Sequence, residues 1–173
     1  MATIYLIRHA EPAILGTFLG QSDPPLSETG HAQAAALSRL PVEIAYVSPL
    51  LRARETASYF RSCEIFVVPE LTEIDFGSWT GKSWKQIQRD WPQLARQKEQ
   101  DWLGVSPPGG EKWADFCARV RLAWHRIRAG TLPAAVVAHQ GVNASLASMI
   151  INDAALSFHQ TYAEVTPIEY ANH

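Results

Sequence analysis

Two histidines, two arginines and a glutamate follow short apolar runs of this 173-residue sequence. They are Arg8, His9, Arg52, Glu73 and His139. Guanidinium groups bind phosphate oxygens bidentately and stay charged at every physiological pH. A neutral imidazole can attack phosphorus, and a carboxylic acid can protonate the oxygen that leaves. These residue types together indicate phosphoryl transfer in which the protein supplies the positive charge and needs no metal ion or cofactor.

The five residues can act together only if the fold brings them to one place, and the sequence pattern predicts such a fold. Short apolar runs typical of strands lie at residues 4–7, 44–47, 65–68, 134–138 and 163–169. Between them are a helical pattern capped by Ser27 and ended by Pro41, and further helical patterns at 51–60, 83–91, 111–128 and 142–151. This alternation predicts an α/β fold, a three-layer α/β/α sandwich with a mainly parallel central sheet, formed by a single domain over residues 1–173. Ligands bind at the carboxyl ends of strands in such sheets, so we expect the five residues to converge there.

The composition argues against several other functions. The formal net charge is −2, so no overall positive field attracts nucleic acid. No apolar run approaches the roughly 18–20 residues of a membrane span, and the first residues lack the basic start of a signal peptide. Cys63 and Cys117 form no C-x-x-C motif, which argues against a zinc cluster or a disulfide framework. We therefore expect a cytoplasmic protein that binds neither nucleic acid nor membranes, and the sequence leaves its oligomeric state open.

Several motifs occur in an order that resembles one known family. The first is Ile7-Arg8-His9-Ala10-Glu11, and the second runs from Gly20-Gln21-Ser22-Asp23 through Pro25-Leu26-Ser27 to Gly30 and Gln33-Ala34. Others follow at residues 48–57, 71–81 and 108–111, and the last is His139-Gln140-Gly141. From about residue 4 to residue 150 this order resembles the histidine phosphatase superfamily, also called the phosphoglycerate mutase-like family. Among its members, the chain looks most like those of the α-ribazole phosphatase type.

The resemblance implies a role for each matching residue. His9 would be the nucleophile that becomes phosphohistidine, while Arg8, Arg52 and His139 would hold the phosphoryl oxygens. Glu73 would protonate the leaving group and then activate water. The arginines should keep His9 unprotonated, and burial or the anionic substrate should let Glu73 keep its proton near neutral pH. Gln21 is a candidate substrate-binding residue, with bracing of its own loop as the alternative.

The chain also departs from the family pattern. Ala10 stands where glycine is commoner, Pro12 and Leu15 stand where many mutases have polar residues, and Thr80 replaces a frequent glutamate. The chain is shorter than a typical mutase, which leaves little tail to exclude water from a phosphoenzyme, so we expect hydrolysis rather than transfer.

The resemblance therefore implies a metal-independent phosphomonoesterase for a small phosphorylated substrate, with α-ribazole 5′-phosphate as the candidate. The alternatives are a broad small-molecule or phosphoglycerate-type phosphatase, a phosphohistidine protein phosphatase, and a non-catalytic protein that binds phosphorylated ligands. An enclosed pocket would favour small substrates, and an open, shallow site would favour proteins. Trp79 and Trp84 are expected to be packing residues, with a place in the pocket wall as the alternative.

Overall fold

The central sheet has five strands in the order β3-β2-β4-β1-β5. The computed structural model describes residues 2–152 and 154–171 of the chain. The strands are β1 (Ala2–Arg8), β2 (Ile44–Val47), β3 (Glu64–Val67), β4 (Ala134–Ala138) and β5 (Val165–Tyr170). Strand β5 is antiparallel to β1, and the other neighbouring pairs are parallel. The mainly parallel sheet predicted from the sequence is confirmed.

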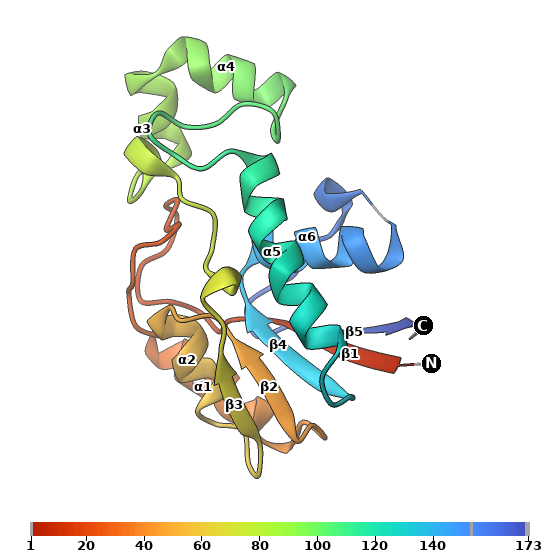
Figure 1. Ribbon diagram of the computed structural model, residues 1–173. Coiled ribbons are helices and arrows are strands. Elements are labelled where there is room, and N and C mark those ends of the chain that lie inside the picture. The colour runs from red at the N-terminus through yellow and green to blue at the C-terminus, as the bar shows by residue number, and fades with distance from the viewer. Residues whose placement is uncertain (1, 153, 172–173) are drawn as a thin grey trace.

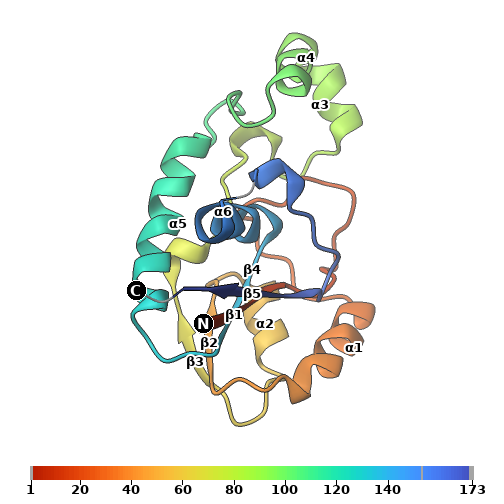
Figure 2. The ribbon, with the colours of Figure 1, turned by 90° about the vertical axis from the view of Figure 1, so that its right-hand side faces the viewer.

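Helices cover both faces of this sheet. The described residues form α1 (Glu28–Ala36), α2 (Leu51–Ala57), α3 (Trp84–Asp90), α4 (Pro92–Gln100), α5 (Trp113–Arg128) and α6 (Gln140–Ile151). Helices α1 and α2 lie against one face and α5 and α6 against the other, which gives the three expected layers (Figure 2). Helices α3 and α4 form a pair apart from the sheet, at one end of the molecule (Figure 1).

Strand β4 lies in the middle of the sheet and is apolar at every position. All five of its side chains are fully buried. Ala134, Val136 and Ala138 pack into the core beneath α5 and α6, whereas Ala135 and Val137 pack into the core beneath α2. Successive strand residues point to opposite faces, so a strand covered on both sides must be apolar at every position.

Side chains that cap helix ends account for the start of two helices. The Ser27 hydroxyl accepts a hydrogen bond from the Gly30 backbone at 2.9 Å and so begins α1. Ser83 and Gln86 form a reciprocal capping box at the start of α3. Helix α5 instead depends on packing, because its apolar residues recur every three or four positions and form one buried stripe. The buried members of this stripe are Phe116, Val120, Ala123, Trp124 and Ile127.

The sequence pattern does not predict helix α4, because it has a helix ending near Pro92 and no further helix before residue 111. The structure places Pro92 at the first position of α4, where its missing N–H is no loss. Trp91, between the two helices, has φ −135° and ψ 62°, which is not helical. Pro92 therefore lies just after the end of α3 and is itself the first residue of α4.

Candidate active site

The five predicted residues converge at the carboxyl ends of the strands. Arg8 is the last residue of β1, His9 follows it, and His139 follows β4 at the start of α6. Because β1 and β4 are adjacent and parallel, the rings of His9 and His139 lie 5.1 Å apart between centroids. Arg52 lies in the first turn of α2, and Glu73 lies in the segment between β3 and α3.

His9 is held as a neutral imidazole. Its ring is buried, its Nδ1 lies 2.7 Å from the carbonyl oxygen of Ala10, and Nε of Arg52 donates to its Nε2 at 3.3 Å. Burial and then the positive charge of Arg52 lower the pKa of His9 to about 3. The hydrogen bond to the Ala10 carbonyl opposes them by a smaller amount, and the charge of Arg8 makes the smallest contribution to the lowering. The sequence-based expectation that the arginines keep His9 unprotonated therefore agrees with this environment, in which burial has the larger effect.

Arg52 is fixed by the loop that carries the second motif. Its Nη1 donates to the carbonyl oxygen of Ser22 at 2.6 Å, and its Nη2 donates to that of Gly20 at 2.8 Å. The Thr56 hydroxyl donates to the Arg52 carbonyl and accepts from the backbone N–H of Ala10, which ties α2 to the segment after β1. Three hydrogen bonds thus fix the guanidinium beside the nucleophile candidate.

Arg8 is positioned by residues from the far end of the chain. Its Nη1 donates to the backbone carbonyl of Gln160 at 2.7 Å, and its guanidinium carbon lies 4.2 Å from the centre of the Tyr162 ring. Gln160 is itself buried, and its side chain donates to the Leu6 carbonyl and accepts from Asn143. The Nε of Arg8 is buried and makes no hydrogen bond within the described residues, so it is available to an oxyanion.

The sequence pattern offers no signal for Gln160 or Tyr162. Both lie in the connection before β5, beyond the last motif, where neither periodicity nor a recognisable spacing marks them. They reach Arg8 because β5 runs antiparallel to β1 and its start therefore lies beside the end of β1. Only knowledge of that long-range pairing could have identified them.

Glu73 has a buried carboxyl group whose oxygens both meet backbone N–H groups. Its Oε1 accepts from Ile74 at 2.9 Å and its Oε2 accepts from Gly141 at 3.1 Å. Burial raises the pKa of Glu73, against the lowering effect of these two hydrogen bonds and of the nearby arginines. Gln21 donates to the backbone carbonyl of Glu73 at 3.2 Å and is not among the residues that line the cavity, a placement that fits loop bracing.

His139 is also buried and kept neutral. Its Nε2 lies 2.7 Å from the Ser48 hydroxyl, and its Nδ1 makes no hydrogen bond within the part of the chain that the structure describes. Burial, together with the nearby His9 and the arginines, lowers the pKa of His139 well below its usual value. The residue therefore has one ring nitrogen without a partner in the described residues, and its ring centroid lies 5.1 Å from that of His9.

A cavity of about 290 Å³ opens over Arg8, His9, Arg52 and Glu73, whereas His139 is not among the residues that line it. Part of its lining is polar and comes from Arg8, His9, Arg52, Glu73 and Gln140. The larger part is apolar and comes from residues between β1 and α1, beside Glu73, between α4 and α5, and at the first position of α5: Phe18, Leu19, Ile74, Phe76, Trp102, Leu103, Val105, Pro107 and Trp113. The arrangement can hold an anionic group against the arginines while an organic group lies against aromatic rings.

Trp79 and Trp84 support this wall from behind and do not line the cavity. Trp79 is fully buried, and both rings contact Phe18 edge-on or at a tilt, with centroids 6.1–6.2 Å away. Trp84 also contacts Trp102, at 5.5 Å between ring centroids. The expectation that the two tryptophans are packing residues is confirmed.

The described residues contain no cluster of metal ligands and no helix that could span a membrane. No three or more His, Cys, Asp or Glu side chains among them are grouped so that they could hold a metal ion. In the same part of the chain, every helix is too short or too polar to cross a lipid bilayer.

Several bacterial proteins are similar to this chain in sequence. The 2,3-bisphosphoglycerate-dependent phosphoglycerate mutase of Bartonella quintana is 33% identical over 135 residues, which cover 68% of this chain and 64% of the mutase. The adenosylcobalamin/α-ribazole phosphatase of Salmonella typhimurium is 29% identical over 165 residues, which cover 89% of this chain and 82% of that enzyme. The chain spans only 37% of the length of three mycobacterial relatives, to which it is 31% identical.

Structural similarity extends over almost all of the chain. The crystal structure of the α-ribazole phosphatase from Shigella flexneri superimposes with a TM-score of 0.85 at 26% sequence identity, covering 96% of this chain and 90% of that one. The model of one family, the histidine phosphatase superfamily (branch 1), matches residues 4–173. The chain therefore belongs to the histidine phosphatase superfamily, as its motifs led us to expect.

Proposed function

We propose that the protein is a phosphomonoesterase that works through a phosphohistidine at His9 and needs no metal ion. In the first step the lone pair on Nε2 of His9 attacks phosphorus, and the ester P–O bond breaks. The proton of the Glu73 carboxyl group passes to the leaving oxygen. Arg8 and Arg52 hold the phosphoryl oxygens, with the free Nδ1 of His139 as a further contact.

The second step returns the enzyme to its starting state. The Glu73 carboxylate takes a proton from water, the water oxygen attacks phosphorus, and the P–N bond to His9 breaks. Inorganic phosphate leaves, and Glu73 again carries its proton. Because burial raises the pKa of Glu73, the same group is suited to give up a proton and to recover it near neutral pH.

One observation carries this proposal: the hydrogen bonds at the two nitrogens of His9. The carbonyl oxygen of Ala10 can only accept, so Nδ1 carries the proton; the guanidinium of Arg52 can only donate, so Nε2 carries the lone pair. A nucleophilic nitrogen is thus aligned beside the cation that would bind the phosphoryl group.

Hydrolysis of p-nitrophenyl phosphate in excess EDTA tests the proposal. We expect turnover by the wild type and by His125→Ala, a control in which an exposed histidine of α5 is removed. His9→Ala should keep the fold and lose turnover and the acid-labile phosphoenzyme. Normal activity of His9→Ala would exclude a phosphohistidine at this residue. A wild type that binds vanadate but turns over neither p-nitrophenyl phosphate nor natural phosphomonoesters would be a binding protein instead.

For the substrate we propose a small phosphomonoester with a bulky organic leaving group, and α-ribazole 5′-phosphate as its first candidate. The aromatic part of the cavity lining suits a planar base. Besides Arg8 and Arg52, Lys98 is the positively charged residue among the described residues that line the cavity. Its ammonium group donates to the Val105 carbonyl at 2.6 Å and lies over the Trp102 ring. A small acid such as phosphoglycerate would therefore find few free partners for its carboxylate.

A substrate panel separates the remaining candidates. We expect a higher kcat/KM for α-ribazole 5′-phosphate than for 3-phosphoglycerate or a phosphohistidine peptide. A preference for 3-phosphoglycerate would favour a phosphoglycerate-type enzyme, and formation of 2-phosphoglycerate from it would reveal a mutase. A preference for the peptide would favour a protein phosphatase.

A further inference from the structure

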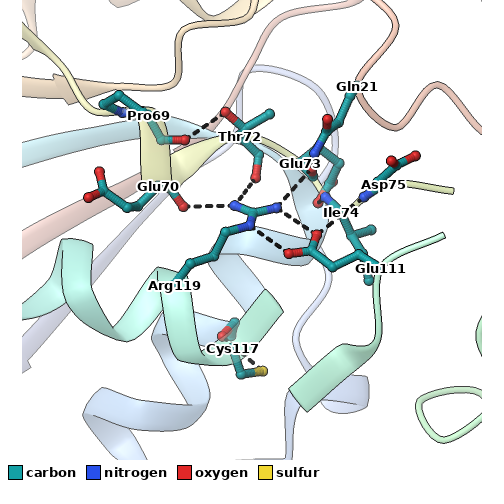
Figure 3. A network of polar contacts seen from close by, with 11 residues as sticks. Gln21, Pro69, Glu70, Thr72, Glu73, Ile74, Asp75, Glu111, Cys117 and Arg119 are labelled. Atoms are coloured by element: carbon teal, nitrogen blue, oxygen red, sulfur yellow. Dashed lines mark hydrogen bonds and ion pairs between the residues drawn. The ribbon is translucent and has the colours of Figure 1, made fainter. Parts of the chain in front are cut away.

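The guanidinium of Arg119, on α5, uses all of its N–H groups within the protein (Figure 3). Its Nε and Nη2 donate to the two carboxylate oxygens of Glu111 at 2.7 and 2.8 Å. Its Nη1 donates to the backbone carbonyls of Glu70 and Thr72 at 2.9 and 2.6 Å, and its Nη2 also donates to that of Glu73 at 3.1 Å. These five bonds match the five donors of a guanidinium, so Arg119 has none left for substrate.

Glu111 belongs to the Pro-Gly-Gly-Glu motif, and this motif packs directly on the segment that carries Glu73. The backbone N–H of Glu111 donates to the Asp75 carbonyl at 2.9 Å, and that of Ser78 donates to the Pro108 carbonyl at 3.0 Å. Gly77 has φ +50°, and a Cβ at this position would collide with the backbone of Gly110 and Pro108. Two glycine-containing turns can therefore approach closely only because neither has a side chain there.

Arg119 and Gln21 both bind the backbone of Glu73. The carbonyl oxygen of Glu73 accepts hydrogen bonds from Nη2 of Arg119 at 3.1 Å and from Nε2 of Gln21 at 3.2 Å, so its backbone is held by two side chains. The carboxyl group then meets backbone N–H groups alone, those of Ile74 and Gly141. The direction of the Glu73 side chain depends on where this segment of backbone is held.

We propose that Arg119, aligned by Glu111, is a positioning residue that holds the segment 70–73 so that the Glu73 carboxyl group meets the leaving oxygen. The inference rests on the proposed function, because it concerns the proton donor of that reaction. Glu111 reaches the cavity, yet both of its oxygens are bound to Arg119, which neutralises its charge toward an anionic substrate. Arg119 itself does not line the cavity and acts only through Glu73.

Substrates that differ in their leaving group test this role. A p-nitrophenolate leaves without a proton, whereas an alkoxide must be protonated as the bond breaks. Since kcat/KM reports the step in which the ester bond breaks, a misplaced acid lowers kcat/KM for the alkyl ester and not for the aryl ester. Arg119→Lys keeps the charge but lacks the planar fork of donors, and Glu111→Gln replaces one acceptor oxygen with a donor. Arg121→Lys, an exposed arginine of the same helix, is the matched control.

The readouts are kcat/KM for n-propyl phosphate and for p-nitrophenyl phosphate, with vanadate inhibition as a measure of the phosphate site. In Arg119→Lys and Glu111→Gln we expect the fold loss in kcat/KM to be about tenfold or more larger for the alkyl ester than for the aryl ester, because a misplaced general acid slows only the departure of the alkoxide. Vanadate inhibition should stay within about twofold of wild type, and Arg121→Lys should match wild type with both esters.

Equal losses with the two esters, or no loss, would overturn the positioning role while leaving the phosphatase intact. If Arg119→Lys does not unfold cooperatively on heating, that variant is not folded and cannot be used. The ratio of kcat/KM for the alkyl ester to kcat/KM for the aryl ester, measured in Glu111→Gln, then decides the question. Loss of folding in both variants would show a purely structural clamp and would also overturn the inference. A wild type inactive on both esters would instead contradict the proposed function, on which this role depends.

Discussion

Nε of Arg52 donates a hydrogen bond to Nε2 of His9 over 3.3 Å, while Nδ1 of the same ring lies 2.7 Å from the Ala10 carbonyl. Arg52 therefore faces the lone pair that would attack phosphorus. Because the other two nitrogens of Arg52 are bound to loop carbonyls, its orientation does not depend on a ligand. A phosphoryl oxygen that takes over the Arg52 Nε–H would leave the Nε2 lone pair free at the moment when phosphorus is beside it.

Substitution of Arg52 by lysine should remove most of the activity. A lysine ammonium cannot reach His9, Gly20 and Ser22 at once, because it lacks the planar fork. Hydrogen bonds to charged groups contribute about 1.5–3 kcal/mol, so we expect kcat/KM for p-nitrophenyl phosphate to fall roughly 10²-fold. Arg54→Lys, at an exposed position of the same helix, should be unaffected. More than half of the wild-type kcat/KM in Arg52→Lys would mean that the fork geometry is not required.

Acid should destabilise the protein through His9. The pKa of His9 is lowered from about 6.5 to about 3, so between these pH values the unfolded chain binds a proton that the folded chain does not. Stability is therefore lost as pH falls below about 6.5, by at most about 1.4 kcal/mol per pH unit for this group. From pH 7.5 to 5.0, we expect wild type to lose about 2 kcal/mol more of its free energy of unfolding than His9→Asn, measured with urea. An equal loss in both proteins would contradict a buried neutral His9, and His125→Asn should behave as wild type.

The parts of the site that follow strands could be predicted from the sequence. An apolar run of four or five residues predicts a strand, and the Arg-His or His-Gln-Gly that follows it at once predicts where the strand ends. Since parallel strands of one sheet end on the same side, His9 and His139 are expected at the same edge of the sheet. Their rings lie close together because β1 and β4 are neighbours, which the sequence pattern does not specify. Arg52 follows the same reasoning, because it lies in the first turn of the helix after β2.

The parts that depend on long-range pairing could not be predicted in the same way. The Arg119–Glu111 pair joins a helix residue to a turn that precedes the helix, so no helical spacing marks it. Gln160 and Tyr162 reach Arg8 only because β5 returns antiparallel to β1. Helix α4 was missed because a proline after a helical pattern favours a helix end as much as a new helix start.

Replacement of Glu73 by glutamine should separate proton transfer from binding. Glutamine keeps an acceptor oxygen for a backbone N–H but has no proton to give to the leaving group. We expect kcat for an alkyl phosphate to fall by about 10²–10⁴, with vanadate inhibition little changed. Because Glu73 acts first as an acid, the wild-type kcat/KM should decrease as pH rises through its raised pKa, and this decrease should be absent in Glu73→Gln. A Glu73→Gln variant with wild-type kcat would assign the acid to another group, and Glu70→Gln is the matched control outside the cavity.

Tyr162 should contribute through its ring and not through its hydroxyl group. The guanidinium carbon of Arg8 lies 4.2 Å from the ring centre, and the ring lies 5.7 Å from that of His9. Cation–π contacts contribute about 0.5–2 kcal/mol, so Tyr162→Leu should lower kcat/KM for p-nitrophenyl phosphate by roughly two- to thirtyfold. Tyr162→Phe keeps the ring and should stay within about twofold of wild type. If phenylalanine lowered kcat/KM as much as leucine does, the hydroxyl group and not the stacking on Arg8 would be the contribution of this residue.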